Sequence, residues 1–263
     1  MFLREDNIVE YAFVSGKPFE EIDPHKEHWK RLRRRFDTGG LGGFQDYEVI
    51  EIALTLTRAR GDCKGIAKQA LKRFHTVRGV LDATPDELRT IRGIGPISAS
   101  GIKLIRALAE HYYHEQMIRD TSSVGNSQAV VDYLKVSMRS LERESFRMVY
   151  LDAQNNPTGT ETLFEGTLTS SVVYPREVLK KALDHKAASV IFAHNHPSGC
   201  TEPSENDRQI TRDLVLAASL VDVRVLDHIV VGVNSHYSFA DHGLMQEYRK
   251  QAMDFQESRR RLA

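Results

Sequence analysis

The spacing of apolar residues along the chain changes near residue 120. Between residues 44 and 115, apolar side chains recur at intervals close to the 3.6-residue period of an α-helix. Examples are the runs DYEVIEIALTL (46–56), AKQALKRF (67–74) and GIKLIRALA (101–109). The glycine-rich segment TGGLGG (38–43) ends any helix that precedes it. This half of the chain is therefore predicted to be all-helical.

Beyond residue 127, short apolar runs typical of strands alternate with helical patterns. The strand-like runs are FRMVYLDA (146–153), ETLFEGTLTSSVVYP (161–175), SVIFAHNH (189–196), VRVLDHIVVGV (223–233) and HYSFAD (236–241). The helical patterns between them are REVLKKALDHKA (176–187) and PSENDRQITRDLVLAASLV (203–221). Such alternation of strand and helix predicts an α/β domain.

The two patterns define a domain organisation. We expect a helical region at 1–115, a linker at 116–126, an α/β domain at 127–248, and a C-terminal tail or helix at 249–263. The linker is placed beside DTSSVGNS (120–127), a cluster of small polar residues.

Composition narrows the class of protein. The chain has 263 residues, and its 36 basic and 36 acidic side chains give a formal net charge of zero. This balance argues against a wholly basic nucleic-acid-coating protein but allows a local basic patch such as KRLRRR (30–35), whose default interpretation is a solvated helix face. Two cysteines give no disulfide framework, and neither a signal peptide nor a membrane-spanning run is recognisable. We therefore expect a cytoplasmic protein.

Candidate chemistry concentrates where the strand-like run SVIFA ends. His194 and His196 are two residues apart, so in a strand both imidazoles point to the same face. Asp207 follows eleven residues after His196, in a helix expected to start near Pro203. Two imidazole nitrogens, one carboxylate and a water are the composition of a catalytic zinc site. The alternative is that the two histidines are ordinary polar residues at the start of a loop and bind no metal. Cys200, which lies nearby, is treated as a bystander.

The segment HNHPSGCTEPSEND (194–207) resembles the motif of the JAMM/MPN-domain metalloproteases, in which HxH is followed by seven residues, serine, two residues and aspartate. Together with YPREVLKKAL (174–183) and LDHIVVG (226–232), it is similar to the RadC family over roughly residues 126–242. The resemblance implies an MPN/JAMM-like α/β fold, a cytidine-deaminase-like mixed sheet with helices. It also implies one Zn²⁺ per chain on His194, His196 and Asp207.

Hydrolysis at such a site also needs a proton-transfer group. JAMM enzymes use a glutamate upstream of the HxH motif, and the matching place in this chain favours Glu144 over Glu142, Glu161 and Glu165. Its alternative is a solvated charge at the end of a helix. Ser204 resembles the JAMM serine that donates a hydrogen bond to the oxyanion, and its alternative is a helix cap.

Two further side-chain assignments complete the C-terminal half. His228 is interpreted as a hydrogen-bonded core histidine in preference to a partner of the metal ligands. Arg176 is expected to have a structural role.

The helical half contains a second motif. LRTIRGIGPISASGI (88–102) resembles a helix-hairpin-helix motif, whose glycine turn and following helix start offer backbone N–H groups to a phosphate. Arg92, Gly93, Gly95 and Lys103 are the expected nucleic-acid contacts. A role in packing helices or in contacting a protein is the alternative.

These observations leave two functional hypotheses. The first is a zinc-dependent peptidase or isopeptidase acting on a protein or peptide, with Glu144 as general base and Ser204 supporting the oxyanion. The second is a DNA-associated protein, related to DNA repair or recombination, whose MPN half is a metal-stabilised scaffold. A peptidase that acts on proteins at DNA would combine the two. The sequence indicates neither the substrate nor the oligomeric state.

Overall fold

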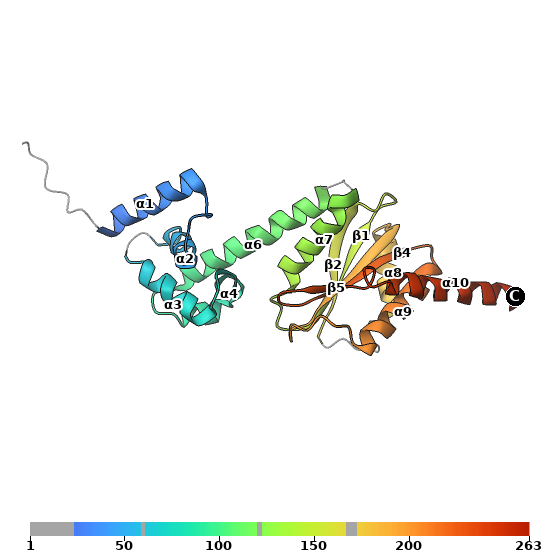
Figure 1. The fold of residues 1–263 in the computed structure, drawn as a ribbon. Helices are drawn as coiled ribbons and strands as arrows, with labels where there is room; N and C mark the ends of the chain where they lie inside the picture. The colour runs from blue at the N-terminus through green and yellow to red at the C-terminus, as the bar shows by residue number, and fades with distance from the viewer. Residues whose placement is uncertain (1–23, 59–60, 120–122, 167–172, 263) are drawn as a thin grey trace, which may run out of the picture. The chain divides into compact units, whose positions relative to one another are not determined.

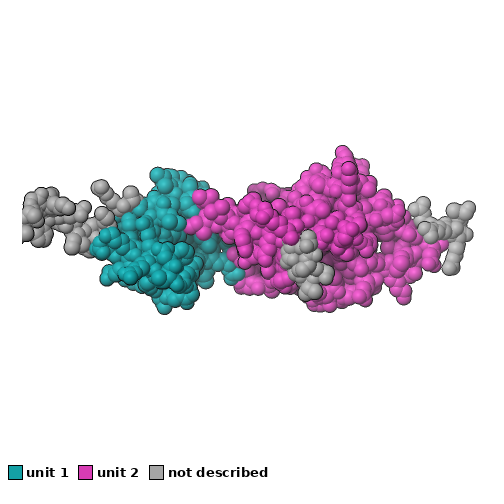
Figure 2. Space-filling model, turned by 90° about the horizontal axis from the view of Figure 1, so that it is seen from above, with its two compact units in different colours: residues 1–103 teal, residues 104–263 magenta. Residues whose placement is uncertain are grey.

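A computed structural model describes residues 24–58, 61–119, 123–166 and 173–262 of the chain. Its contacts divide the chain into two compact units, residues 1–103 and 104–263 (Figure 2). The division falls within a long helix, α6, rather than in the linker expected at 116–126. Residues 116–119 end this helix and residues 123–126 begin the next one, so most of the expected linker is helical. The small polar residues there are compatible with a helix start, which accounts for the difference.

The described part of the first unit is helical, as the spacing of apolar residues predicts. Its elements are α1 (Pro24–Gly39), α2 (Asp46–Thr55), α3 (Lys64–Phe74), α4 (Val77–Asp82), α5 (Pro85–Arg89) and the start of α6 (Pro96–Arg119). Thr84 caps α5 reciprocally with Glu87, and Pro85 opens the helix, so the sequence itself specifies where this short helix begins. Trp29, Leu54, Ala67 and Leu88 belong to one buried apolar cluster.

The second unit contains a five-stranded mixed sheet. In chain order the elements are α7 (Ser123–Met138), β1 (Ser145–Leu151), β2 (Pro157–Glu165), α8 (Pro175–Asp184), β3 (Ser189–Asn195), α9 (Glu205–Ser219), β4 (Arg224–Val231), β5 (His236–Ser238) and α10 (Leu244–Leu262). The strand order is β2-β1-β3-β4-β5. β3 and β4 are parallel, and the other neighbouring pairs are antiparallel. The α/β expectation is therefore confirmed as a mixed sheet with helices.

Successive strand residues point to opposite sides of the sheet, so the apolar strands present two apolar faces, and helices cover both of them. Helices lie on both sides of the sheet (Figure 1). Phe146 and Phe192 face a core shared with α8, α9 and α10, whereas Val149 and Ile191 face a core shared with α7 and the end of α6. The central strand β3 is buried along its whole length. The residues at the end of this strand are therefore held in place by packing on both sides.

The second strand starts earlier in the sequence than its apolar pattern indicates. It runs from Pro157 to Glu165 instead of starting at Glu161, and residues 167–172 of the expected strand lie outside the described part. The cause is a tight hairpin in which the Asp152 carboxylate accepts hydrogen bonds from the backbone N–H groups of Gln154 and Asn156. This local turn chemistry fixes the strand's start more strongly than hydrophobicity does.

The C-terminal residues form a helix that belongs to the second unit. α10 starts at Leu244, and Tyr248 and Ala252 are buried in the core beneath it. The boundary expected at residue 248 therefore cuts through a packed helix. None of the helices in the described ranges combines the length and the apolar character that crossing a membrane requires.

Candidate metal centre

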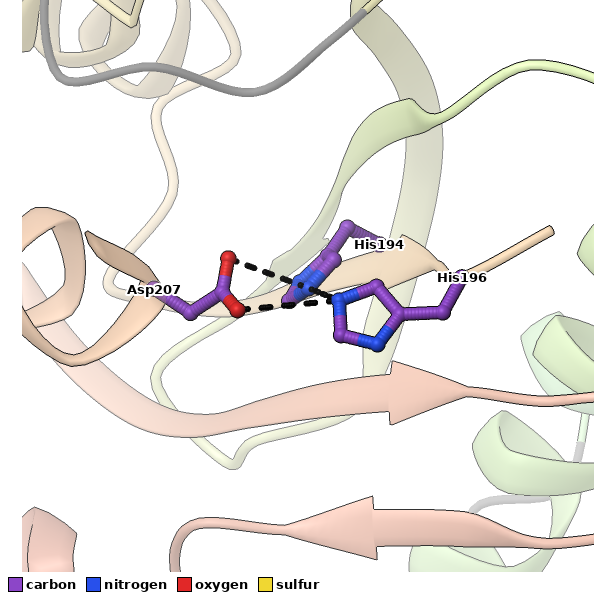
Figure 3. Close-up of side chains that lie close together, drawn as sticks. All are labelled: His194, His196 and Asp207. Carbon is purple, nitrogen blue, oxygen red and sulfur yellow. Dashed lines mark hydrogen bonds and ion pairs between the residues drawn. The ribbon is translucent and has the colours of Figure 1, made fainter. Parts of the chain in front are cut away.

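Three predicted ligand residues meet at the end of β3 (Figure 3). His194 is on the strand and fully buried, His196 follows the strand, and Asp207 lies in the first turn of α9. The Nε2 atoms of the two histidines are 2.9 Å apart. The Asp207 carboxylate oxygens lie 3.3 Å from Nε2 of His194 and 3.6 Å from Nε2 of His196. The potential ligand atoms of all three side chains therefore face one another.

The start of α9 fixes the position of the aspartate. Ser204 is the N-cap, and its hydroxyl accepts a hydrogen bond from the Asp207 backbone N–H at 3.2 Å. The Asp207 carboxylate in turn accepts from the Ser204 backbone N–H at 2.8 Å and from the Ser204 hydroxyl at 2.6 Å. This capping box places the carboxylate directly in front of the strand end.

The environment of Asp207 favours its charged form. Burial on its own would raise the pKa of this carboxyl, but the adjacent His194 and His196 imidazoles and the hydrogen bond from the Ser204 hydroxyl outweigh it and hold the pKa well below the usual range. A buried carboxylate that stays ionised is the anionic ligand that a divalent cation requires.

The loop after β3 orients His196. Gly199 adopts a left-handed conformation with φ of 83°, which turns the chain so that the Cys200 carbonyl lies 2.7 Å from Nδ1 of His196. Because a carbonyl oxygen only accepts, Nδ1 carries the proton, and in the neutral ring the lone pair is on Nε2. The Asp207 carboxylate 3.6 Å away, followed by the hydrogen bond with the Cys200 carbonyl, raises the pKa of His196, although burial lowers it. Cys200 thus contributes its backbone rather than its thiol.

The residues present fit a metal ion. Zinc binds imidazole nitrogen and carboxylate oxygen at about 2.0–2.2 Å, so two ligands of one ion can be at most about 4.4 Å apart. All three separations are below that limit. Within the described ranges, this is the one group of at least three histidine, cysteine or acidic side chains that could hold a metal ion.

Glu144 immediately precedes β1 and is half-buried. It lines a hollow whose other walls are Glu142, Arg143, Gly166, Pro197 and Ser198, and the last two of these follow His196 in the sequence. The charge of Glu144 is among those that raise the pKa of His196. Glu161, by contrast, binds the Lys181 ammonium at 2.6 Å and the Tyr150 hydroxyl at 2.9 Å. Glu144 and Glu142 therefore lie beside the metal centre, whereas Glu161 is bound to other side chains.

Asn195, between the two histidines, has a role that the sequence did not indicate. Its side chain points to the opposite face of the sheet, where Oδ1 accepts from the Ser145 backbone N–H at 2.8 Å. Its amide donates to the carbonyls of Leu141 and Arg143 at 3.3 and 3.0 Å. This one side chain fixes the segment that carries Glu144 to the strand that carries the ligands.

His228 on β4 is a partner of a predicted metal ligand, which is the interpretation disfavoured from the sequence. It is buried as expected, but its Nε2 lies 2.8 Å from Nδ1 of His194, and its Nδ1 lies 2.6 Å from the Thr211 hydroxyl. Burial, above all, lowers its pKa well below the ordinary value. These partners lie 34 and 17 residues away along the chain, so only the folded sheet reveals them.

The four residues expected to contact nucleic acid lie in different settings. Arg92, Gly93 and Gly95 are exposed around the turn between α5 and α6, and Gly93 has a φ of 102° that favours glycine. The Lys103 ammonium instead donates hydrogen bonds to the carbonyls of Leu81, Asp82 and Ala83 at 2.9, 3.3 and 3.0 Å. Lys103 therefore caps the end of α4, and this contact accounts for a lysine at that position.

Comparison with known proteins identifies the family. The family described as "RadC-like JAB domain" matches residues 124–244. A UPF0758 protein of Leptothrix cholodnii is 40% identical over 215 residues, which cover 82% of this chain and 96% of that protein. Relatives from Nitrosospira multiformis and Pseudoalteromonas translucida are 38% and 40% identical over the same shares of this chain and of their own lengths. The chain belongs to the RadC family, and the His194–His196–Asp207 group lies in its JAB domain.

Proposed function

We propose that this protein is a zinc-dependent hydrolase of the JAMM type that cleaves an amide or isopeptide bond in a protein or peptide. The observation that carries the proposal is the meeting of His194, His196 and ionised Asp207 beside a hollow lined by Glu144. When bound, zinc polarises a carbonyl group and lowers the pKa of a coordinated water.

The protein's own residues supply binding and proton transfer in this proposal. His194, His196 and Asp207 hold the ion, and their arrangement is set by β3 and by the capped start of α9. Glu144 takes a proton from the attacking water and passes it to the leaving nitrogen, as a general base and then a general acid. Asn195 keeps the segment of Glu144 in register with the ligands.

Ser204 is the donor proposed for the oxyanion of the tetrahedral intermediate. Ser204 is an exposed residue, but the single proton of its hydroxyl is directed to the Asp207 carboxylate. Donation to an oxyanion therefore requires the hydroxyl to turn away from Asp207. A donor of this kind contributes about 3–4 kcal/mol to transition-state stabilisation.

Metal content is the first test. Elemental analysis of the purified protein should find about one zinc per chain, and the His194→Ala/His196→Ala variant should contain none. A native protein that purifies without metal and does not take up added zinc would overturn the proposal.

Cleavage is the second test. The zinc-loaded protein is incubated with a peptide library made from a bacterial proteome, and new chain ends are identified by mass spectrometry. We expect new ends with the native protein and with Glu161→Gln, and none with Glu144→Gln or with a chelator. Undiminished cleavage by Glu144→Gln would show that another group is the base.

DNA binding by the helical unit is the second candidate, and the exposed turn at Arg92, Gly93 and Gly95 favours it. Residues 24–103 carry 16 basic and 9 acidic side chains, and residues 1–23 add 2 basic and 6 acidic ones, which gives the unit 18 and 15. A local excess of positive charge of this kind attracts phosphate.

The turn can be tested by introducing a negative charge into it. A Cβ at Gly95 or at Gly42 would meet no atom within 4 Å, so a side chain can begin at either position without a clash. Affinity for duplex and branched DNA, measured by fluorescence anisotropy across salt concentrations, should fall for Gly95→Glu and not for Gly42→Glu. Equal affinity of the two variants would exclude the turn as the contact.

A further inference from the structure

A continuous line of hydrogen bonds leads from the backbone of α9 to the buried metal ligand. The Thr211 hydroxyl lies 2.6 Å from the Asp207 carbonyl oxygen and 2.6 Å from Nδ1 of His228. Nε2 of His228 lies 2.8 Å from Nδ1 of His194. Thr211, His228 and His194 are all fully or almost fully buried, so no solvent competes for these contacts.

The direction of this line follows from its first member. A backbone carbonyl can only accept a hydrogen bond, so the single hydroxyl proton of Thr211 is donated to Asp207. The Thr211 oxygen then offers only lone pairs to His228. Nδ1 of His228 must therefore carry a proton and donate it to Thr211.

The same reasoning passes through the ring of His228 to the metal site. Burial disfavours a second proton on this ring, so its Nε2 presents a lone pair. Nδ1 of His194, facing that lone pair, must be the donor. With Nδ1 donating to His228, Nε2 is the nitrogen of His194 that is left to bind an ion, and it faces His196 and Asp207.

We propose that Thr211 and His228 are positioning residues that hold His194 in the tautomer whose Nε2 can bind a divalent metal ion. The inference rests on the proposed metal site, and it concerns how that site is prepared before the ion arrives. If the hydroxyl of Thr211 is removed, the ring of His228 can protonate on Nε2 and donate to His194. His194 would then carry its proton on Nε2, where it blocks the metal.

The variants that test this relay differ by single atoms. Thr211→Val removes the hydroxyl and keeps the branched shape, whereas Thr211→Ser keeps the hydroxyl. Thr55→Val is the matched control, because Thr55 is also buried on a helix and donates to a backbone carbonyl, that of Ile52, in the other unit. Loss of helix or packing stability alone would affect Thr55→Val as well.

The first readout is the tautomer itself. Nitrogen-15 NMR of the metal-free protein at about pH 8, above the ordinary histidine pKa of about 6.5, distinguishes a protonated Nδ1 from a protonated Nε2. We expect His194 to be protonated on Nδ1 in the native protein and in Thr211→Ser, and on Nε2 in Thr211→Val. A native protein with the proton of His194 on Nε2 overturns the proposal, whether or not the valine variant folds.

The second readout is zinc affinity, measured by competition with a chromogenic chelator. Loss of a hydrogen-bond partner behind a metal ligand typically weakens binding about 10- to 100-fold, and we expect this loss in Thr211→Val only. Native affinity in a folded Thr211→Val protein would overturn the relay while leaving the metal site intact. Absence of zinc binding by the native protein would instead overturn the proposed function, and the tautomer measurement would still decide the relay.

Discussion

Asp207 is the residue at which the fold and the proposed chemistry are most closely joined. One carboxylate closes the capping box of α9 and faces both histidines. Its low pKa keeps it anionic, and the two imidazoles lack a negative charge of their own. A neutral replacement of Asp207 should therefore remove the negative charge that allows three side chains to bind a divalent cation.

We predict that Asp207→Asn no longer binds one zinc per chain, because the negative charge is lost. The variant should still fold, because asparagine keeps the shape of the side chain even though it is a weaker partner in the capping box. Elemental analysis and chelator competition measure the change. Asp213→Asn, an exposed replacement further along α9, should retain about one zinc per chain. Full zinc occupancy in Asp207→Asn would contradict the assignment of this ligand.

Lys103 illustrates how a positive charge in a suggestive motif can have a structural role. Its ammonium satisfies three carbonyl groups at the end of α4. Hydrogen bonds to a charged group contribute about 1.5–3 kcal/mol. We predict that Lys103→Met lowers the free energy of unfolding by about 2 kcal/mol, measured in urea by the fluorescence of Trp29.

Arg92, an exposed residue of the same motif, is the control for Lys103. Arg92→Met should change stability by no more than about 0.5 kcal/mol, as surface replacements usually do. If Lys103→Met left stability unchanged and abolished DNA binding, the capping role would be wrong.

At the scale of elements, the loop between β3 and α9 packs against the end of β4. A Cβ at Gly232 would lie 2.6 Å from the Gly199 carbonyl oxygen and 2.6 Å from a methyl group of Thr201. Contacts this short force the backbone to move. The displaced loop is the one that supplies the Cys200 carbonyl to His196.

We therefore predict that Gly232→Ala costs about 1–3 kcal/mol of stability and weakens zinc binding, because His196 loses its acceptor. Thermal unfolding and chelator competition measure the two effects. Gly159→Ala on β2 is the matched control, since its Cβ would make only an ordinary contact of 3.8 Å with Tyr150. Equal zinc affinity in Gly232→Ala and Gly159→Ala would show that the position of this loop does not affect zinc binding.

The elements also show which features of the fold and of the site can be predicted from the sequence. The spacing of apolar residues predicts the helical first half and the strand-helix alternation of the second, and the HxH motif predicts which three side chains meet. Asn195, Thr211 and His228 escape prediction because their partners are 50, 17 and 34 residues away. Only the strand order places β1 and β4 on either side of β3.

At the scale of the whole molecule, the two units have separate buried cores. The core of the first unit draws its members from residues 29–102, and the two cores around the sheet draw theirs from residues 117–252. The single tryptophan of the chain, Trp29, is in the first of these and is 9% exposed. Its fluorescence therefore reports on the unfolding of the helical unit.

The metal ligands, in contrast, all belong to the second unit, so zinc should stabilise that unit selectively. A ligand at 100 times its Kd adds about 2.7 kcal/mol to stability, which for a unit of this size raises Tm by roughly 5 to 10 °C. We predict such a shift in melting followed by far-ultraviolet circular dichroism, and an unchanged midpoint in the fluorescence of Trp29. His194→Ala/His196→Ala should show no shift with either probe. A zinc-dependent shift of the Trp29 signal in the native protein, absent from that variant, would mean that the helical unit unfolds together with the sheet, because the ion would then stabilise both cores through one cooperative transition.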